Sequence, residues 1–369
     1  MASTSGSSTS PSLFDGAQLR SLTLRNRTWL APMCQYMIEA EDGVPTDWHL
    51  MHLGARAAGG FGLLVTEATA ISPEGRISPL DAGLWNEDQV RAWSRIIGFC
   101  RAQGAAVAAQ LSHAGRKAST WPVLPRYAAR RGTIPEFASG WRTVGPTEDP
   151  YPGLDAPEAM TSADIQGVVD DFAVAARRAR DAGFDALELH FAHGYLVHEF
   201  LSPLINTRTD EYGGSPEARR RLAREVAAAV REEWPSDLPI IVRISASDWI
   251  DGGWDVGQSV DLAHELAGVG VDCLHVSTGG AVAADIAVGS EYQVGFARTI
   301  RDATSMPVAA VGLIAEPRQA QEIIARGDAD FVAVGRAALR EPSWPLRAAH
   351  ELDAREPQLY PGPYRRGAW

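Results

Sequence analysis

The chain has 369 residues, of which 45% are hydrophobic and 22% are charged, and its formal net charge at pH 7 is −12. This length exceeds an average domain but is common for a single α/β barrel. The acidic charge argues against nucleic acid or an anionic membrane as a partner, and no apolar run is long enough to span a bilayer, so the composition favours a small-molecule ligand.

The chain begins with a polar segment, residues 1–12, that is rich in Ser, Thr and Gly. It has neither a basic region nor an apolar stretch, so we interpret it as a disordered tail and not as a signal peptide, and we expect a cytoplasmic protein. Residues 13–369 are expected to form one domain. Cys34, Cys100 and Cys273 are isolated. Because no CxxC spacing is present, the sequence predicts no metal site and no disulfide framework.

The order of the predicted elements indicates the fold. Weak alternation over Leu13–Leu24, around Asp15-Gly16, predicts a hairpin that caps the bottom of a barrel. Eight short apolar segments follow, each ahead of a helical pattern: Trp29–Pro32, Leu63–Thr66, Ala106–Leu111, Ala186–His190, Ile240–Ile244, Cys273–Val276, Val308–Val311 and Phe331–Val334. Helical spacing is seen in Gln89–Gln103, Ala163–Ala182, Pro216–Glu233, Val256–Ala267 and Pro317–Arg326.

Eight alternating strands and helices predict an α/β fold of the (β/α)8 TIM-barrel type, because parallel strands need crossover helices. A doubly wound open sheet is the alternative, but no GxGxxG fingerprint follows the first strand. The stretch 118–160 has no clear period and is rich in Pro, Gly, Trp and Arg, so we interpret it as a long excursion after strand three. Such excursions at the top face of a barrel often shape a substrate site.

A cluster of polar side chains follows the fourth predicted strand. His190 ends that strand, and His193 and Tyr195 come shortly after it. If one helical turn follows, the two histidines share a face, because residues three apart are neighbours on a helix. Two imidazoles can donate hydrogen bonds to an oxygen, and a phenol can deliver a proton. Barrel enzymes keep their reacting groups at strand ends, so this trio is the first candidate active site.

The last two predicted strands end in glycine, at Gly312 and Gly335, and Arg336 follows the second. Backbone N–H groups approach a phosphate closely where no Cβ intervenes, and an arginine adds a charged fork. The sequence therefore predicts a phosphate-bearing ligand.

Five motifs carry a family resemblance. They are PMCQY, QLSHAGRK, HFAHGYLVHEFLSPLINTRTDEYGGS, VRISASD and the closing VGR. Together they resemble the flavin-dependent old yellow enzyme family, and within it the thermophilic-like bacterial ene-reductases, from Leu13 to Trp369. The resemblance implies a (β/α)8 barrel with non-covalent FMN at its top.

The resemblance assigns cofactor contacts residue by residue. Cys34 would tune the flavin potential, Gln110 would pair with the pyrimidine edge, and Arg243 would face the N1/C2 carbonyl end and stabilise the negative charge of the reduced ring. The full set of implied cofactor-binding residues is Ala31, Pro32, Met33, Cys34, Ala68, Gln110, Arg243, Gly312, Gly335 and Arg336.

The resemblance also implies a reaction. NADPH or NADH reduces the flavin and leaves, and an α,β-unsaturated carbonyl compound then binds where the nicotinamide was. His190 and His193 would hold the carbonyl oxygen, and Tyr195 would protonate Cα. Tyr36 would be a second donor to the carbonyl, and Arg366 would enter the substrate site of a neighbouring subunit of a homodimer or homotetramer, with residues 357–369 as the interface tail. Ala368 precedes the final Trp369, so Arg365 also stays a candidate.

Other functions are open on the sequence alone. A Schiff-base aldolase or other non-redox lyase on a phosphate-binding barrel needs a lysine, and Lys117 is the only one in the chain. A metal hydrolase could use His190 and His193, but neither HExxH nor a His-x-His on strand one is present. The third alternative is a catalytically silent flavin-binding protein. Side chains that we interpret as structural are Asp248, Asp251, Arg208, Asp210 and Tyr212.

Overall fold

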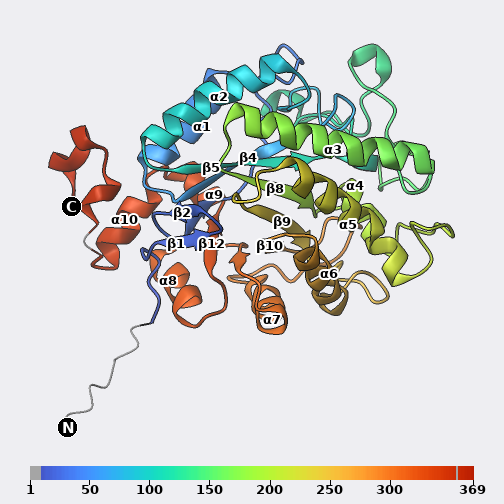
Figure 1. The fold of residues 1–369 in the computed structure, drawn as a ribbon. Helices are drawn as coiled ribbons and strands as arrows, with labels where there is room; N and C mark the ends of the chain where they lie inside the picture. The colour runs from blue at the N-terminus through green and yellow to red at the C-terminus, as the bar shows by residue number, and fades with distance from the viewer. Residues whose placement is uncertain (1–9, 355) are drawn as a thin grey trace, which may run out of the picture.

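The computed structural model describes residues 10–354 and 356–369, and its centre is a closed barrel of eight parallel strands surrounded by helices (Figure 1). In the order in which they pair, the strands are β10 (Cys273–Ser277), β11 (Val308–Ala310), β12 (Phe331–Val334), β3 (Thr28–Leu30), β4 (Leu63–Ala70), β5 (Ala106–Ser112), β8 (Ala186–Phe191) and β9 (Ile240–Ser245). The predicted (β/α)8 fold is confirmed, and every predicted strand is present.

The helices alternate with the strands as the sequence pattern predicts. They are α1 (Asp47–Ala58), α2 (Glu87–Ala102), α3 (Ser162–Ala182), α4 (Leu196–Leu201), α5 (Pro216–Glu233), α6 (Val256–Gly268), α7 (Val294–Thr304), α8 (Pro317–Ala325), α9 (Arg336–Arg340) and α10 (Trp344–Glu351). Their starts follow local chemistry: Asn86 and Thr161 form capping boxes, and Pro216 occupies the first turn of α5, where its missing N–H costs nothing.

The first barrel strand is shorter than predicted. It ends at Leu30 and not at Pro32. Ala31 still donates a backbone hydrogen bond to Val334, but proline has no N–H with which to continue the ladder. The residues after Leu30 therefore leave the barrel wall as a loop.

The N-terminal hairpin is present, but its turn was predicted at the wrong place. Strands β1 (Ala17–Leu19) and β2 (Leu22–Leu24) pair in antiparallel fashion, so the turn lies at Arg20 and Ser21 and not at Asp15-Gly16. Arg20 adopts a left-handed conformation with φ of 50°. Its side chain and the Ser21 backbone bond to the loops that precede β9 and β10, which holds the hairpin at the bottom of the barrel.

The segment after β5 is irregular, as predicted. It contains the short 3₁₀ helices η1 (Gly115–Lys117), η2 (Pro125–Tyr127) and η3 (Glu136–Ala138), and a small parallel pair, β6 (Val144–Gly145) with β7 (Glu158–Ala159). Of the tail expected over residues 1–12, residues 1–9 lie outside the described residues. The Pro11 carbonyl accepts a hydrogen bond from the Gln321 side chain.

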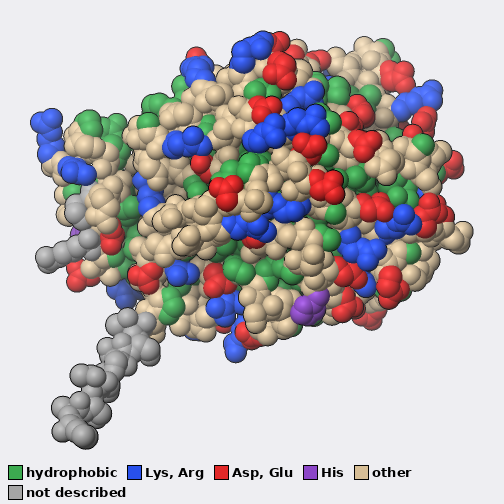
Figure 2. All heavy atoms as spheres, viewed as in Figure 1, with side chains coloured by type: hydrophobic (Ala, Val, Ile, Leu, Met, Phe, Trp, Pro, Cys, Tyr) green, Lys and Arg blue, Asp and Glu red, His purple; other side chains and the backbone are tan. Residues whose placement is uncertain are grey.

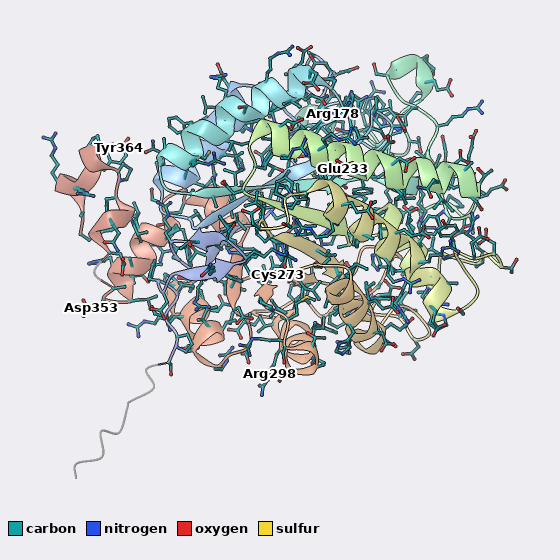
Figure 3. The ribbon with its side chains drawn as sticks, viewed as in Figure 1. Arg178, Glu233, Cys273, Arg298, Asp353 and Tyr364 are labelled. Atoms are coloured by element: carbon teal, nitrogen blue, oxygen red, sulfur yellow. The ribbon has the colours of Figure 1, made fainter. Side chains whose placement is uncertain are left out.

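The interior of the barrel changes from apolar to polar along its axis. Its apolar part includes Trp29, Ile241, Phe331 and Cys273, with the rings of Trp29 and Phe331 stacked at 4.6 Å. Figure 3 places Cys273 in the middle of the molecule, within β10. Toward the carboxyl ends of the strands the buried side chains become polar and charged. The predicted site residues, apart from Arg366, lie at this end of the barrel.

The visible surface carries both signs of charge without a large patch of either, as Figure 2 shows. In the part of the chain that the structure describes, no helix is both long enough and apolar enough to cross a membrane.

Candidate active site

The site is organised by the turn that follows β8. His190 lies within this strand, which continues to Phe191, and His193 and Gly194 then adopt left-handed conformations with φ of 59° and 69°. The expectation that a helical turn places the two histidines on one face is therefore wrong. A Cβ on Gly194 would lie 2.1 Å from the Gly280 carbonyl oxygen, so only glycine fits here.

The three predicted catalytic side chains meet at this turn. The His190 and His193 rings are 5.0 Å apart between centroids, and the His190 and Tyr195 rings are 5.1 Å apart, both edge to face. His190 is buried, whereas His193 and Tyr195 are half-buried. Tyr195 also packs against the apolar cluster of Ala68 and Ala118. The turn thus brings two imidazoles and one phenol to a single point at the mouth of the barrel.

Groups from three other parts of the chain hold this turn. Lys117 Nζ donates to the carbonyl oxygens of His193 and Gly280 at 2.7 and 3.0 Å. The His193 N–H donates to Ser245 Oγ, and the Gly194 N–H donates to His198 Nδ1, both at 2.9 Å. The only lysine of the chain therefore supports the left-handed turn, and its ammonium group is occupied by two carbonyls.

The hydrogen-bond network assigns the imidazole protons. His190 Nδ1 accepts from the Ala192 N–H, so its proton is on Nε2, which lies 3.3 Å from His193 Nδ1. Ser277 Oγ donates to the Ile244 carbonyl and lies 3.0 Å from His193 Nε2, so that nitrogen is the donor. His193 Nδ1 is then an acceptor. In this arrangement the His190 N–H donates to His193 Nδ1, and the His193 N–H donates to Ser277 Oγ.

Burial sets the protonation of the trio. It lowers the pKa of His190 and of His193 well below the ordinary value, and the nearby Arg243 acts in the same direction. Burial also raises the pKa of Tyr195 well above its ordinary value. At neutral pH the site therefore presents two neutral imidazoles and a protonated phenol.

Beside the trio lies a cavity of about 380 Å³ that is lined by Arg243, Arg336 and Arg340 and by His193. Within residues 10–354 and 356–369, none of the three arginines forms an ion pair. Three cations without a carboxylate partner, in a chain of net charge −12, indicate a site for an anion.

Two predicted glycines shape this cavity. Gly312 has φ of 121°, and a Cβ there would lie 2.6 Å from the Gln293 side-chain nitrogen. A Cβ on Gly335 would come no closer than 3.7 Å to Met33 and 3.9 Å to Ala31, so its glycine leaves an open cradle. The phosphate end of FMN fits this combination of arginines and bare backbone.

The loop after β3 lies near Tyr195 and Gly335. Ala31 is buried and Pro32 half-buried. Cys34 packs against the cluster that contains Ala68, as Tyr195 does. Burial raises the pKa of the Cys34 thiol well above its ordinary value, as do Asp81 and Glu67, so this cysteine is a neutral thiol. Tyr36, with φ of 55°, lies beside Cys34, and burial raises its pKa as well.

Gln110 and Arg243 both lie inside the barrel. Gln110 Nε2 donates one of its two N–H groups to Glu188 Oε1 at 2.7 Å, so it can offer its amide oxygen and its second N–H to a ligand. Arg243 pairs in register with His190 on one side and with His275 on the other. Burial lowers its pKa, although Glu188 opposes the shift.

Arg366 is the predicted site residue that this single chain does not bring to the mouth. It lies in the exposed C-terminal 3₁₀ segment η5 (Gly362–Gly367), beyond α10. Trp369 stacks on His350 of α10 at 5.4 Å, and Tyr364 projects from the edge of the molecule (Figure 3).

The residues interpreted as structural, apart from Asp251, form hydrogen bonds with neighbouring loops and with α5. Asp248 accepts from Ser202 Oγ and the Trp254 N–H, and Arg208 pairs with Asp210 and donates to the carbonyls of Pro146 and Met160. Tyr212 donates to Glu225, and Asp251 is exposed. Among the described residues, no group of three or more His, Cys, Asp or Glu side chains could hold a metal ion.

Sequence reasoning missed several groups around the mouth. Ser277, Thr278 and Gln293 line the cavity, and Gln293 Oε1 accepts from the Thr278 backbone and hydroxyl. No motif marked them. Glu188 could have been found, since it lies two residues before His190 on the same face of a strand.

Comparisons with known proteins identify the family of the chain. Residues 12–355 match the model of the NADH:flavin oxidoreductase / NADH oxidase family. The chain is 44% identical over 340 residues to an NADPH dehydrogenase of Geobacillus thermodenitrificans, covering 92% of this chain and 94% of that protein. It is 40% identical over 355 residues to an NADPH dehydrogenase of Bacillus subtilis, covering 96% and 98%.

Solved structures of similar proteins have the same fold. Morphinone reductase in complex with tetrahydroNAD superposes with a TM-score of 0.77 at 29% identity, over 95% of each chain. An old yellow enzyme homologue from Zymomonas mobilis superposes with a TM-score of 0.78 at 30% identity, over 95% of this chain and 97% of that one.

Proposed function

The chain belongs to the NADH:flavin oxidoreductase / NADH oxidase family, that of the old yellow enzymes, and from this premise we propose that it reduces the activated C=C bond of α,β-unsaturated carbonyl compounds. It is an NAD(P)H-dependent oxidoreductase that uses FMN. The chemistry that bound FMN supplies is the transfer of a hydride from NAD(P)H to the β-carbon of the alkene. The observation that carries the proposal is the meeting of His190, His193 and Tyr195 beside the arginine-lined cavity.

The two histidines bind the carbonyl oxygen of the substrate and draw electron density from its β-carbon. His190 Nε2 already carries a proton. For His193 to donate as well, its proton moves to Nδ1, and Nε2 then accepts from the Ser277 hydroxyl, which leaves the Ile244 carbonyl. Two neutral donors at one oxygen stabilise the enolate-like charge that develops there as the β-carbon is attacked.

Tyr195 delivers the proton. Its raised pKa keeps the phenol protonated at neutral pH, so it can give its O–H proton to Cα and regain one from solvent. Hydride at Cβ and proton at Cα complete the saturated product. Tyr36 supplies a second hydroxyl on the carbonyl side.

The chain's own side chains position the cofactor. Arg243 would face the pyrimidine end of FMN, Gln110 would pair with that end through its amide group, and Gly312, Gly335 and Arg336 would hold the phosphate. The loop residues Ala31, Pro32, Met33 and Cys34, together with Ala68, line the ring. We also propose a homodimer or homotetramer, in which Arg366 or Arg365 of the C-terminal tail enters the neighbouring site.

The test uses the purified protein under anaerobic conditions. We expect yellow protein that bleaches with NADPH, regains its colour with 2-cyclohexenone, and yields cyclohexanone in equal amount. Protein that bleaches with NADPH but is not reoxidised by any of a panel of enones, nitroalkenes and maleimides would refute ene-reduction. Bound flavin with no reduction by either nicotinamide would identify a catalytically silent flavin-binding protein.

A further inference from the structure

A buried carboxylate lies inside the barrel, directly below the mouth. Glu188 precedes His190 by two residues on β8, so both side chains point to the same side of the strand. It is completely shielded from solvent, and in register it lies opposite Gln110 on β5. None of the roles proposed above uses this charge.

Both oxygens of Glu188 are engaged by neutral donors. Oε1 accepts from Gln110 Nε2, and Oε2 lies 2.7 Å from His275 Nδ1. His275 Nε2 has no hydrogen-bond partner in the described part of the chain, and the ring meets the edge of Trp29 at 6.2 Å. A buried N–H without an acceptor is costly, so the proton of His275 lies on Nδ1 and the imidazole is neutral.

The Glu188 carboxylate is therefore the negative charge in this part of the barrel interior, where Gln110, His275 and Arg243 surround it. Burial alone would raise the pKa of Glu188, but His275, Arg243 and the Gln110 amide outweigh burial and hold the pKa below its ordinary value. Burial lowers the pKa of His275, which agrees with a neutral ring. The positive charge in the same part of the interior is Arg243, one strand away on β9. Among the described residues, Arg243 makes no ion pair within 4 Å.

We propose that Glu188 sets the reduction potential of the bound FMN, because its charge opposes the field of Arg243 at the pyrimidine end and its hydrogen bond fixes the amide of Gln110. The inference rests on the cofactor position proposed above. Arg243 alone favours the negative charge that reduction brings to this end of the cofactor, which raises the potential. Glu188 lowers it again, so that the reduced enzyme stays a strong hydride donor to an alkene.

Substitution Glu188→Gln tests this directly, since it removes the charge and keeps the size. We expect the potential of bound FMN, measured against reference dyes, to rise by at least the equivalent of a tenfold change in the reduction equilibrium, about 30 mV for a two-electron couple. Reduction by NADPH should become faster and reoxidation by 2-cyclohexenone slower. A substitution that only loosened the site would slow both reactions.

Two further variants separate charge from packing. Glu188→Asp keeps the charge and should shift the equilibrium less than threefold. Glu199→Gln is the matched control: Glu199 is also fully buried, and burial raises its pKa to about 8, so at neutral pH a neutral acid is replaced by a neutral amide. It should leave the potential unchanged.

If Glu188→Gln does not fold, His275→Leu asks the same question, because a buried carboxylate that loses its donor takes up a proton and the potential should again rise. An unchanged potential in the folded variant, or equal shifts for Glu188→Gln and Glu188→Asp, would overturn the inference. If the wild-type protein reduces enones and the variants have the same flavin potential as the wild type, the inference fails but the proposed function stands. Wild-type protein without flavin would refute both.

Discussion

The substitution Gly194→Ala tests whether the left-handed turn after β8 is the geometric basis of the site. An alanine with φ near 69° costs about 1–2 kcal/mol in conformational strain, and the smaller freedom of its unfolded chain returns about 0.4–1 kcal/mol. The net cost of conformation alone is thus about 1 kcal/mol.

The steric contact with Gly280 destabilises the variant further. The new Cβ would lie 2.1 Å from the Gly280 oxygen and 2.6 Å from its carbonyl carbon, so backbone must move. That oxygen accepts a hydrogen bond from Lys117 Nζ, and loss of a buried bond to a charged group costs about 1.5–3 kcal/mol. We therefore expect Gly194→Ala to lower the free energy of unfolding by about 3 kcal/mol in total and to displace His193 and Tyr195.

Gly183→Ala is the matched control, because Gly183 ends α3 with φ of 89° and a Cβ there meets nothing within 4 Å. It should cost about 1 kcal/mol and leave turnover intact. The measurements are urea unfolding followed by circular dichroism, and 2-cyclohexenone turnover for both variants. Equal stability of the two variants, or full turnover in Gly194→Ala, would show that the turn is not held as tightly as argued.

Three other predictions concern the proton donor, a buried acid and the cofactor. Tyr195→Phe should slow reoxidation by enones about 10²- to 10⁴-fold and spare reduction by NADPH, in stopped flow; equal losses in both would contradict the assignment. Burial raises the pKa of Glu199 from 4.5 to about 8, so the folded state binds the extra proton and wild-type stability should fall as the pH rises through this range. Glu199→Gln should flatten that slope in urea titrations, and an unaltered slope would count against it. Arg336→Ala should weaken FMN binding about 10- to 100-fold by fluorescence titration, whereas the exposed Arg298→Ala on α7 should not; equal affinities would remove the phosphate from this site.

The sequence alone predicted the fold and the end of the barrel at which the candidate site lies. Strands and helices were readable because their patterns depend on neighbours in the chain: β-branched and aliphatic runs predicted the strands, and helical spacing with start residues such as Pro216 predicted the helices. The position of Tyr195 just beyond a strand end was readable for the same reason.

Only the tertiary structure decided how the site residues meet. His193 reaches His190 through a left-handed turn held by Lys117 and Ser245, which lie 76 and 52 residues away in the chain. The arginine-lined cavity combines β9 with the ends of the last strands, and Glu188 on β8 contacts His275 on β10, on the other side of β9 and 87 residues away in the chain. Barrel closure and strand register set these contacts between distant segments, and local patterns in one chain do not encode them.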